Sequence, residues 1–275
     1  MLCRQLDSLP TSHFPSLHVK MVKYVLTGAT GVLGSRIFKE LLQTVPASDI
    51  AVSLYNPSGP SEEIRASGVE VRHGDYTQPS TLVTAFSNAT KLLIISYPSI
   101  SLSRVELHKA AIDAAKTAGV EHVYYTSLAY ADDSLAAVMH SHLETEKYLK
   151  ASGLKYTIVR EGMYNEVWPL YLGVFDLKTL EGEGELTLPI PIGDGKIAWA
   201  AQDDLGAGTA RILAAPSGYE NRTVVLTGSR ATSLGEVVAK ISGVLQRKVS
   251  LQIVPEEMFV QYQTGKLPEE TLRGP

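Results

Sequence analysis

Three glycines follow one another at intervals of three residues in the segment KYVLTGATGVLGSRI, residues 23–37. Gly28, Gly31 and Gly34 stand between an apolar run that predicts a strand and an amphipathic run that predicts a helix. The first amides of such a helix have no intrahelical acceptor, and together with the helix dipole they can bind an anion. Glycines keep side chains away from the approaching diphosphate. The segment therefore predicts a dinucleotide site, with a purely structural turn as the alternative.

The segment that follows the second predicted strand, SLYNPSG (53–59), bears on the choice of coenzyme. An acidic residue here usually binds the ribose 2′-hydroxyl of NAD, and an arginine accommodates the 2′-phosphate of NADP. This chain has neither, so no acid repels a phosphate. We expect NADP(H) as the preferred coenzyme, with NAD(H) as the alternative. Arg36 could supply the missing cation, or it is a solvated residue on the first turn of its helix.

Short β-rich runs alternate with amphipathic stretches from residue 23 to about residue 160. Strands are predicted at 23–27, 50–54, 69–73, 91–96, 120–127 and 155–160, with helices near 32–44, 61–67, 79–87, 102–118 and 135–152. The fourth of these helices shows an apolar stripe made of Leu107, Ala110, Ala111, Ala114, Ala115 and Ala118. This alternation predicts an α/β fold, a Rossmann-type doubly wound parallel sheet.

The pattern loosens after residue 160, which divides the chain into regions. We expect a flexible N-terminal tail at 1–20, an NAD(P)-binding Rossmann domain at 21–160 and a smaller C-terminal substrate-binding lobe at 161–275. Some elements of the lobe are expected to return to the Rossmann sheet. Within it, Ser233 and Glu236 predict a capping box that opens a helix at 234–245.

Composition excludes several classes of function. The net charge is -4 and the basic residues are scattered, so we expect no nucleic-acid partner. No run has the roughly 20 apolar residues of a membrane span, so we expect no membrane partner. The single cysteine, Cys3, has no partner for an internal disulfide, which together with the lack of a secretory leader predicts a cytoplasmic protein. The histidines show no metal-ligand spacing with cysteine or acid clusters, so no metal is expected.

Four further segments extend the pattern of the glycine segment. They are HGDYTQPSTLVTAF (73–86), AAKTAGVEHVYYTSLAYAD (114–132), HLETEKYLKASGLKYTIVREGMYNE (142–166) and GDGKIAWAAQDDLG (193–206). In this order, they resemble the NmrA-like family of atypical short-chain dehydrogenases/reductases, and within it the bacterial NADPH-dependent quinone oxidoreductase type. The resemblance covers about residues 22–265.

The resemblance implies a coenzyme site made of the glycine segment and two later loops. The residues implied are Gly28, Thr30, Gly31, Val32, Leu33 and Gly34 around the diphosphate, Asp75 and Tyr76 at the adenine, and Ser96 and Tyr97 on the ribose and nicotinamide side. Asp75 has the alternative interpretation of an exposed turn residue. Related proteins often carry an arginine before Asn-Pro where this chain has Tyr55, which weakens the expectation of NADP(H).

The larger short-chain group places a tyrosine four residues before a lysine, so that the lysine lowers the pKa of the phenol. This chain has Leu143 four residues before Lys147, so the tyrosine is missing. The resemblance implies that Lys147 binds the nicotinamide ribose and acts in catalysis, and that Ser127 bonds a substrate or coenzyme carbonyl. Lys147 has the alternative of an exposed partner of Glu144. His142 is expected to pair with Glu146 on the solvated side of the helix.

The missing tyrosine favours an acceptor that needs no protein base. We expect an NAD(P)H-dependent oxidoreductase that transfers hydride to a quinone or a similar conjugated aromatic acceptor. The segment GMYNEVWPLY (162–171) offers side chains for a small planar substrate, or else it is a hydrophobic hinge. These side chains are Met163, Tyr164, Asn165, Trp168 and Tyr171. The alternative function is an NmrA-like redox sensor that binds NAD(P) without turnover and signals to a protein partner. A homodimer is compatible with either function.

Overall fold

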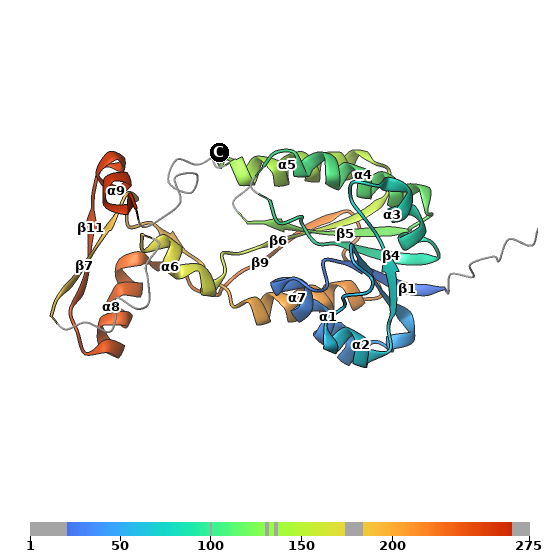
Figure 1. Cartoon of the computed structure of the whole chain (residues 1–275), viewed down its shortest axis with the longest axis horizontal. Coiled ribbons are helices and arrows are strands. Elements are labelled where there is room, and N and C mark those ends of the chain that lie inside the picture. The colour runs from blue at the N-terminus through green and yellow to red at the C-terminus, as the bar shows by residue number, and fades with distance from the viewer. Residues whose placement is uncertain (1–20, 100, 130–131, 135–136, 174–183, 266–275) are drawn as a thin grey trace, which may run out of the picture.

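The computed structural model describes residues 21–99, 101–129, 132–134, 137–173 and 184–265. It consists of a larger part, built on a sheet between two layers of helices, and a smaller lobe at one end of the molecule (Figure 1). The tail expected at 1–20 lies outside the described residues.

The central sheet contains seven strands among the described residues, in the order β3-β2-β1-β4-β5-β6-β9. All its strand pairs are parallel. The strands are β1 (Val22–Thr27), β2 (Ile50–Leu54), β3 (Glu70–His73), β4 (Ala89–Ile94), β5 (His122–Leu128), β6 (Lys155–Glu161) and β9 (Arg222–Leu226). The order reverses between β1 and β4, and ligands of such sheets bind outside the carboxyl ends of the strands at this point. The predicted doubly wound Rossmann-type fold is confirmed.

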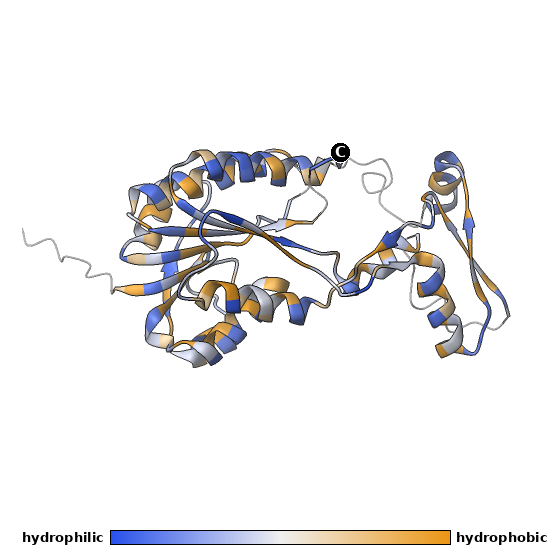
Figure 2. Cartoon of the chain, turned by 180° about the vertical axis from the view of Figure 1, so that it is seen from behind, coloured by the Kyte–Doolittle hydropathy of each residue, from blue (hydrophilic) through white to orange (hydrophobic). Residues whose placement is uncertain are grey.

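Helices cover both faces of the sheet (Figure 1). One layer contains α1 (Val32–Thr44), α2 (Glu62–Ser67) and α7 (Gln202–Ala214), and the other contains α3 (Pro79–Phe86), α4 (Arg104–Thr117) and α5 (Ala137–Ala151). A separate hydrophobic core fills the space between the sheet and each layer, and the strands between the layers are rich in hydrophobic residues (Figure 2). Each predicted strand and helix of the region 21–160 lies within two residues of the observed one.

The apolar stripe predicted for α4 is partly wrong. The buried face of this helix includes Val105, His108 and Ile112 together with three of the predicted alanines. Leu107 and Ala110 are only half-buried. The observed buried face is rotated relative to the predicted stripe. The prediction counted only apolar side chains toward the buried face, whereas His108 is fully buried.

The smaller lobe has its own core. A parallel pair of strands, β7 (Leu186–Ile190) and β11 (Val249–Ile253), packs with α6 (Trp168–Tyr171) and α8 (Leu234–Leu245), and α9 (Glu256–Gln263) follows. Helix α8 has the predicted bounds and the predicted capping box. The Ser233 hydroxyl accepts from the Glu236 amide, and the Glu236 carboxylate accepts from the Ser233 amide.

The chain crosses between the two parts three times in its described portion, after β6, before α7 and after β9. The three crossing segments are hydrogen-bonded to one another. The Gly162 amide donates to the Leu226 carbonyl (2.7 Å), the Asn165 amide to the Ala200 carbonyl (2.8 Å), and the Thr227 hydroxyl to the Ala198 carbonyl (2.8 Å). Two short strands, β8 (Lys196–Ile197) and β10 (Thr232–Ser233), pair beside them. Helix α7 and strand β9, which come from the region 161–275, belong to the larger part.

Candidate coenzyme and acceptor site

Two of the three glycines at the end of β1 and the start of α1, Gly28 and Gly34, have a structural reason. Gly28 has a φ of +65°, a left-handed conformation that favours glycine, and its carbonyl accepts from the Gly31 amide (2.9 Å). A Cβ atom on Gly34 would lie 2.0 Å from the Gly28 carbonyl oxygen. Only glycine at position 34 therefore lets α1 approach the end of β1 this closely.

The amino end of α1 is open to an anion. Gly31 is the N-cap and makes no side-chain cap bond, and the first turn has no acidic residue. Thr30, Gly31 and Val32 are exposed there. An uncapped N-terminus of a 13-residue helix attracts negative charge through its free amides and its dipole. The residues present thus fit the diphosphate of a dinucleotide.

Thr27 organises the strand ends around the glycines, and the sequence analysis missed it. Its hydroxyl oxygen accepts from the Ile95 amide (3.1 Å) and from the Tyr76 hydroxyl (3.0 Å), and it donates to the Leu93 carbonyl (3.3 Å). This buried side chain ties the end of β4 and the loop after β3 to the residue before Gly28. A polar residue at the end of an apolar strand was the available signal.

The structure brings Tyr76, Ser96 and Tyr97 to the same edge as the glycine segment. The ring centroids of Tyr76 and Tyr97 are 5.9 Å apart. Burial raises the pKa of Tyr76 to about 12, whereas Tyr97 is 40% exposed. The Ser96 amide donates to the Thr126 hydroxyl (3.0 Å). These three residues therefore lie near the carboxyl ends of β1 and β4, where the strand order reverses.

The Asp75 carboxylate is used within its own turn. It accepts from the amide (2.8 Å) and hydroxyl (2.7 Å) of Thr77 and from the side chain of Gln78 (3.0 Å). The hydrogen bonds from Thr77 lower the pKa of Asp75. Asp75 is a turn residue, but a buried one rather than the exposed one of the alternative interpretation. Its contact with adenine stays a prediction.

Arg36 has partners within the chain. Its guanidinium forms an ion pair with Asp203 on α7 and donates to the Val32 carbonyl (2.8 Å). This position on the α1–α7 contact does not support the predicted role at a 2′-phosphate. Tyr55, where related proteins often carry arginine, is 74% exposed beyond β2.

Ser127 lies at the buried end of a charge network between β5, α5 and β6. Its hydroxyl donates to Glu146 (2.7 Å), and Arg160 donates to both oxygens of the same carboxylate (2.9 and 2.8 Å). Arg160 also forms two bonds to Asp132 in the loop after β5 (2.9 and 2.8 Å). These bonds to Asp132 and Glu146 raise the pKa of Arg160 and keep it charged. The Ser127 hydroxyl donates its only proton to Glu146, so donating to a substrate or coenzyme carbonyl would require it to leave this partner. The bond to such a carbonyl stays a prediction.

The buried face of α5 contains His142, Thr145 and Glu146, whereas Lys147 is exposed. The position of Lys147 does not support its predicted contact with a nicotinamide ribose. The predicted pairing of His142 with Glu146 on the solvated side is wrong, since both side chains are buried and have other partners. The His142 Nδ1 atom bonds the Tyr125 hydroxyl (2.9 Å).

Two histidines, His108 and His142, are buried on this side of the sheet, and His108 supports the loop that carries Tyr97. His108 accepts from the Tyr97 amide at Nε2 (2.9 Å), so its proton is on Nδ1, which lies 2.9 Å from the Thr145 hydroxyl. Burial lowers the pKa values of His108 and His142 to about 3. Both rings are therefore neutral at physiological pH. Sequence periodicity could not predict these neutral rings, because the two histidines lie on different helices.

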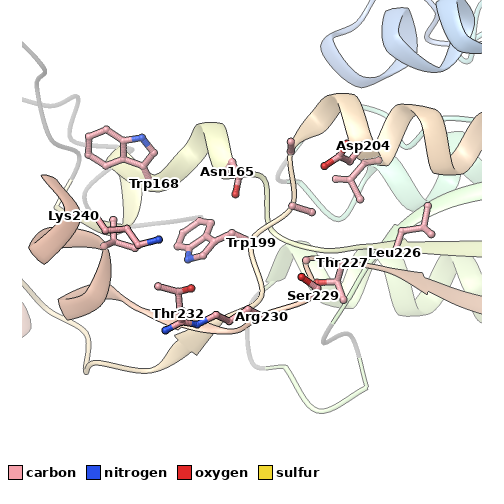
Figure 3. Close-up of a pocket in the computed structure, with 15 residues that line it drawn as sticks. Asn165, Trp168, Trp199, Asp204, Leu226, Thr227, Ser229, Arg230, Thr232 and Lys240 are labelled. Carbon is pink, nitrogen blue, oxygen red and sulfur yellow. The ribbon is translucent and has the colours of Figure 1, made fainter. Parts of the chain in front are cut away.

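The predicted acceptor residues have different environments. The half-buried Tyr164 donates its hydroxyl to the Glu161 carboxyl (3.2 Å), which also accepts from Thr209 on α7 (3.2 Å). Asn165 and Trp168 line a cavity of about 630 Å³ (Figure 3). The Tyr171 hydroxyl lies 3.1 Å from the sulfur of Met163. Tyr164 is thus held against the sheet, and Asn165 and Trp168 face open space.

Glu161 is a buried carboxyl group that the sequence analysis did not single out. Burial raises the pKa of Glu161 to about 7. Glu161 ends β6 directly before the segment that leads to the lobe, so its bonds join the start of that segment to α7.

Metal ligation has no support in the structure: the described ranges contain no group of three or more His, Cys, Asp or Glu side chains that could hold an ion. Within the same ranges, no helix combines the length and the hydrophobicity needed to cross a bilayer.

Comparison with known proteins agrees with this arrangement. The model of the NmrA-like family matches residues 22–272. The chain belongs to the NmrA-like family. It is 39% identical over 245 residues to the NmrA-like family domain-containing oxidoreductase flvB of Aspergillus flavus, covering 87% of this chain and 76% of that protein. It is 36% identical over 234 residues to quinone oxidoreductase 2 of Escherichia coli, covering 85% and 78%.

Solved structures of similar proteins have the same fold. The triphenylmethane reductase of Citrobacter sp., complexed with NADP(H), superposes with a TM-score of 0.81 at 30% identity over 91% of this chain and 86% of that one. The NADPH-dependent quinone oxidoreductase QOR2 of Escherichia coli, complexed with NADPH, has a TM-score of 0.79 at 34% identity over 90% and 85%. The family resemblance inferred from the sequence segments is confirmed.

Proposed function

We propose that this NmrA-like chain is an NAD(P)H-dependent oxidoreductase that transfers hydride to a quinone or a similar conjugated aromatic acceptor. The observation that carries the proposal is the open, glycine-lined amino end of α1 beside Tyr76 and Tyr97. The acceptor class is supported by the names of relatives, which include quinone oxidoreductase 2 and, at 30% identity, the NAD(P)H azoreductase of Xenophilus azovorans. We propose NADP(H) as the preferred coenzyme and NAD(H) as the alternative.

The chain's own residues would bind and orient the reactants. The amides of Val32, Leu33 and Gly34 would hold the diphosphate, and Thr27 and His108 keep the loops that carry Tyr76 and Tyr97 in place. A nicotinamide coenzyme bound there would supply the hydride. Asn165 and Trp168, which face a cavity, would contact the planar acceptor.

At the position where the short-chain group carries its tyrosine, α5 has Leu143, and Lys147 is exposed, so the proposed reaction uses no Tyr-Lys pair for proton transfer. A quinone takes up hydride readily, so its second hydrogen can enter as a proton from water. An alcohol substrate would instead need a base for its hydroxyl proton. This difference favours reduction of activated acceptors over alcohol dehydrogenation.

The test is rapid mixing of the protein and NADPH with a panel of quinones, followed through the absorbance of the reduced nicotinamide. We expect turnover with at least one quinone and its loss in Gly31→Asp. A Cβ on Gly31 would contact only the Gly28 carbonyl, at 3.3 Å, so the variant can fold while its carboxylate repels the diphosphate. Gly193→Asp, at an exposed glycine with open space around it, is the matched control. Absence of turnover across the panel would reject the proposed reaction.

A redox sensor that binds NAD(P) without turnover is the second candidate, favoured by the exposed Lys147 and by Leu143. Its signature would be tight coenzyme binding by calorimetry together with catalytic silence on the same quinones. In that case a protein partner or a homodimer would receive the signal.

We also propose a cytoplasmic location, because Cys3 is the single cysteine of the sequence and cannot form an internal disulfide.

A further inference from the structure

A cavity of about 630 Å³ lies where the small lobe meets the carboxyl ends of β6 and β9 (Figure 3). We call it the two-tryptophan pocket and define it by Trp168, Trp199, Asp204, Arg230, Thr232 and Lys240. None of the residues of the glycine segment lines it. Its volume is typical of a small-molecule site, and junctions between structural units are common places for such sites.

The walls of the two-tryptophan pocket suit an aromatic ligand. Trp168 comes from α6, and Trp199 comes from the segment before α7. The Tyr171 ring packs edge-on against Trp199, with ring centroids 5.3 Å apart and an angle of 88°, and so fixes the plane of the indole. Leu205 and Val237 add apolar surface. A flat ring can therefore contact an indole that is already oriented.

Two hydrogen-bond donors of the pocket have no acceptor. The buried Nε1 atom of Trp199 has no partner among the described residues, and such an unsatisfied group is unfavourable. In the same part of the chain, the Lys240 ammonium group has neither a hydrogen bond nor an ion pair. Figure 3 shows the indole nitrogen and the Lys240 nitrogen directed toward the same space, next to Thr232. A single acceptor group placed there can satisfy both donors.

The charges around this space favour an anion. Arg230 also lies at the Thr232 end, and it is paired with Glu236 (2.6 Å), so those two charges balance. Lys240 is left as an uncompensated positive charge. The pocket's acidic residue, Asp204, lies at the opposite end, on α7. A carboxylate that accepts from Lys240 and Trp199 would form charge-assisted hydrogen bonds, which are stronger than neutral ones.

We infer that the two-tryptophan pocket binds an aromatic carboxylate, with the ring against the indoles and the carboxylate on Lys240 and the Trp199 N–H. Asn165 and Trp168 line this same cavity, so the inference rests on the proposed function and names the chemistry of its acceptor site. Binding to the pocket can still be measured without the coenzyme and without turnover. A carboxylate ligand leaves Arg230 paired with Glu236 and keeps its own charge away from Asp204.

The test is calorimetry on the full chain with 2-naphthoate and with its neutral analogue 2-naphthamide. We expect the acid to bind about tenfold more tightly than the amide, as one charge-assisted contact predicts. Lys240→Met and Trp199→Phe should each weaken binding of the acid by a similar factor and change binding of the amide little. Lys155→Met, at an exposed lysine that begins β6, is the matched control and should bind like the parent protein.

Location is tested separately, because the chain contains two tryptophans and both line the pocket. Intrinsic tryptophan fluorescence should change saturably with 2-naphthoate, with the same dissociation constant as the heat signal. Equal affinity for acid and amide would overturn the inference, as would heat without a fluorescence change, unaltered binding in folded Lys240→Met, or loss of binding in Gly31→Asp. Quinone turnover measured on the same preparation reports on the proposed reaction alone, so the two ideas can fail separately.

Discussion

The buried Glu161 carboxyl makes protein stability depend on pH in an unusual direction. Its pKa is raised by burial from 4.5 to about 7, while the unfolded chain titrates near the ordinary value. Between these two values the folded protein holds a proton that the unfolded chain has released. Stability from this group is therefore fully present below about pH 4.5 and falls as the pH rises toward 7.

The size of the effect follows from the width of this window. The pKa difference is about 2.5 units, and each unit corresponds to about 1.4 kcal/mol, so ionising Glu161 costs about 3 kcal/mol of unfolding free energy by neutral pH. Almost none of this side chain is exposed, at 2%, so solvent does not screen the cost. Glu161→Gln removes the titration and can still bond both Thr209 and Tyr164.

The assay is urea unfolding of the parent protein and of Glu161→Gln, followed by circular dichroism at several pH values. We expect the variant to gain stability relative to the parent as the pH rises from about 4.5 to 7, by up to about 3 kcal/mol, and the difference to stay constant above that. The pKa values of the buried histidines His108 and His142 are lowered to about 3, so both proteins lose unfolding free energy toward acid. This loss is the same in the parent and the variant and cancels in the difference between them. A difference that does not vary with pH would refute the argument from burial.

Three other substitutions test separate parts of the site. Gly34→Ala should lower coenzyme affinity, measured by calorimetry, and cost about 1–3 kcal/mol of stability, because its Cβ would lie 2.0 Å from the Gly28 oxygen; unchanged binding would contradict the glycine argument. Arg160→Met should destabilise the protein by about 3–5 kcal/mol in urea unfolding, since it leaves the buried Glu146 carboxylate without its two-bond partner; adding Glu146→Gln should recover part of the loss. Arg36→Met should change the dissociation constants for NADPH and NADH equally and by less than about threefold, because Arg36 is paired with Asp203. A selective loss of NADPH binding would instead support the predicted role of Arg36 at the 2′-phosphate.

The elements of the larger part could be predicted because each is coded within its own stretch of chain. The glycine spacing, the strand runs and the helical period predicted β1 through β6 and α1 through α5. The capping residues Ser233 and Glu236 likewise fixed the start of α8, since they are three residues apart. In each case the deciding contacts are between near neighbours in the sequence.

Other features depend on partners distant in sequence, and these could not be predicted. A helix with His142 and Glu146 on one face looks solvated until Tyr125 and Arg160, from two strands, provide partners inside the protein. The two-tryptophan pocket likewise combines Trp168, Trp199 and Lys240 from three separate segments. Periodicity in one helix or loop contains no information about such combinations.

The three hydrogen-bonded crossings between the larger part and the lobe have a practical consequence for engineering. The segment from Gly162 to Ala200 and the segment after Leu226 would both have to be replaced to graft a lobe from another protein, because α7 and β9 lie between them and complete the sheet. A cut in the exposed loop at 191–195 would leave both fragments bound to each other, since each contributes strands or helices to the remaining assembly. Rotation of the lobe must bend three neighbouring backbones together, which resists torsion more than one linker would.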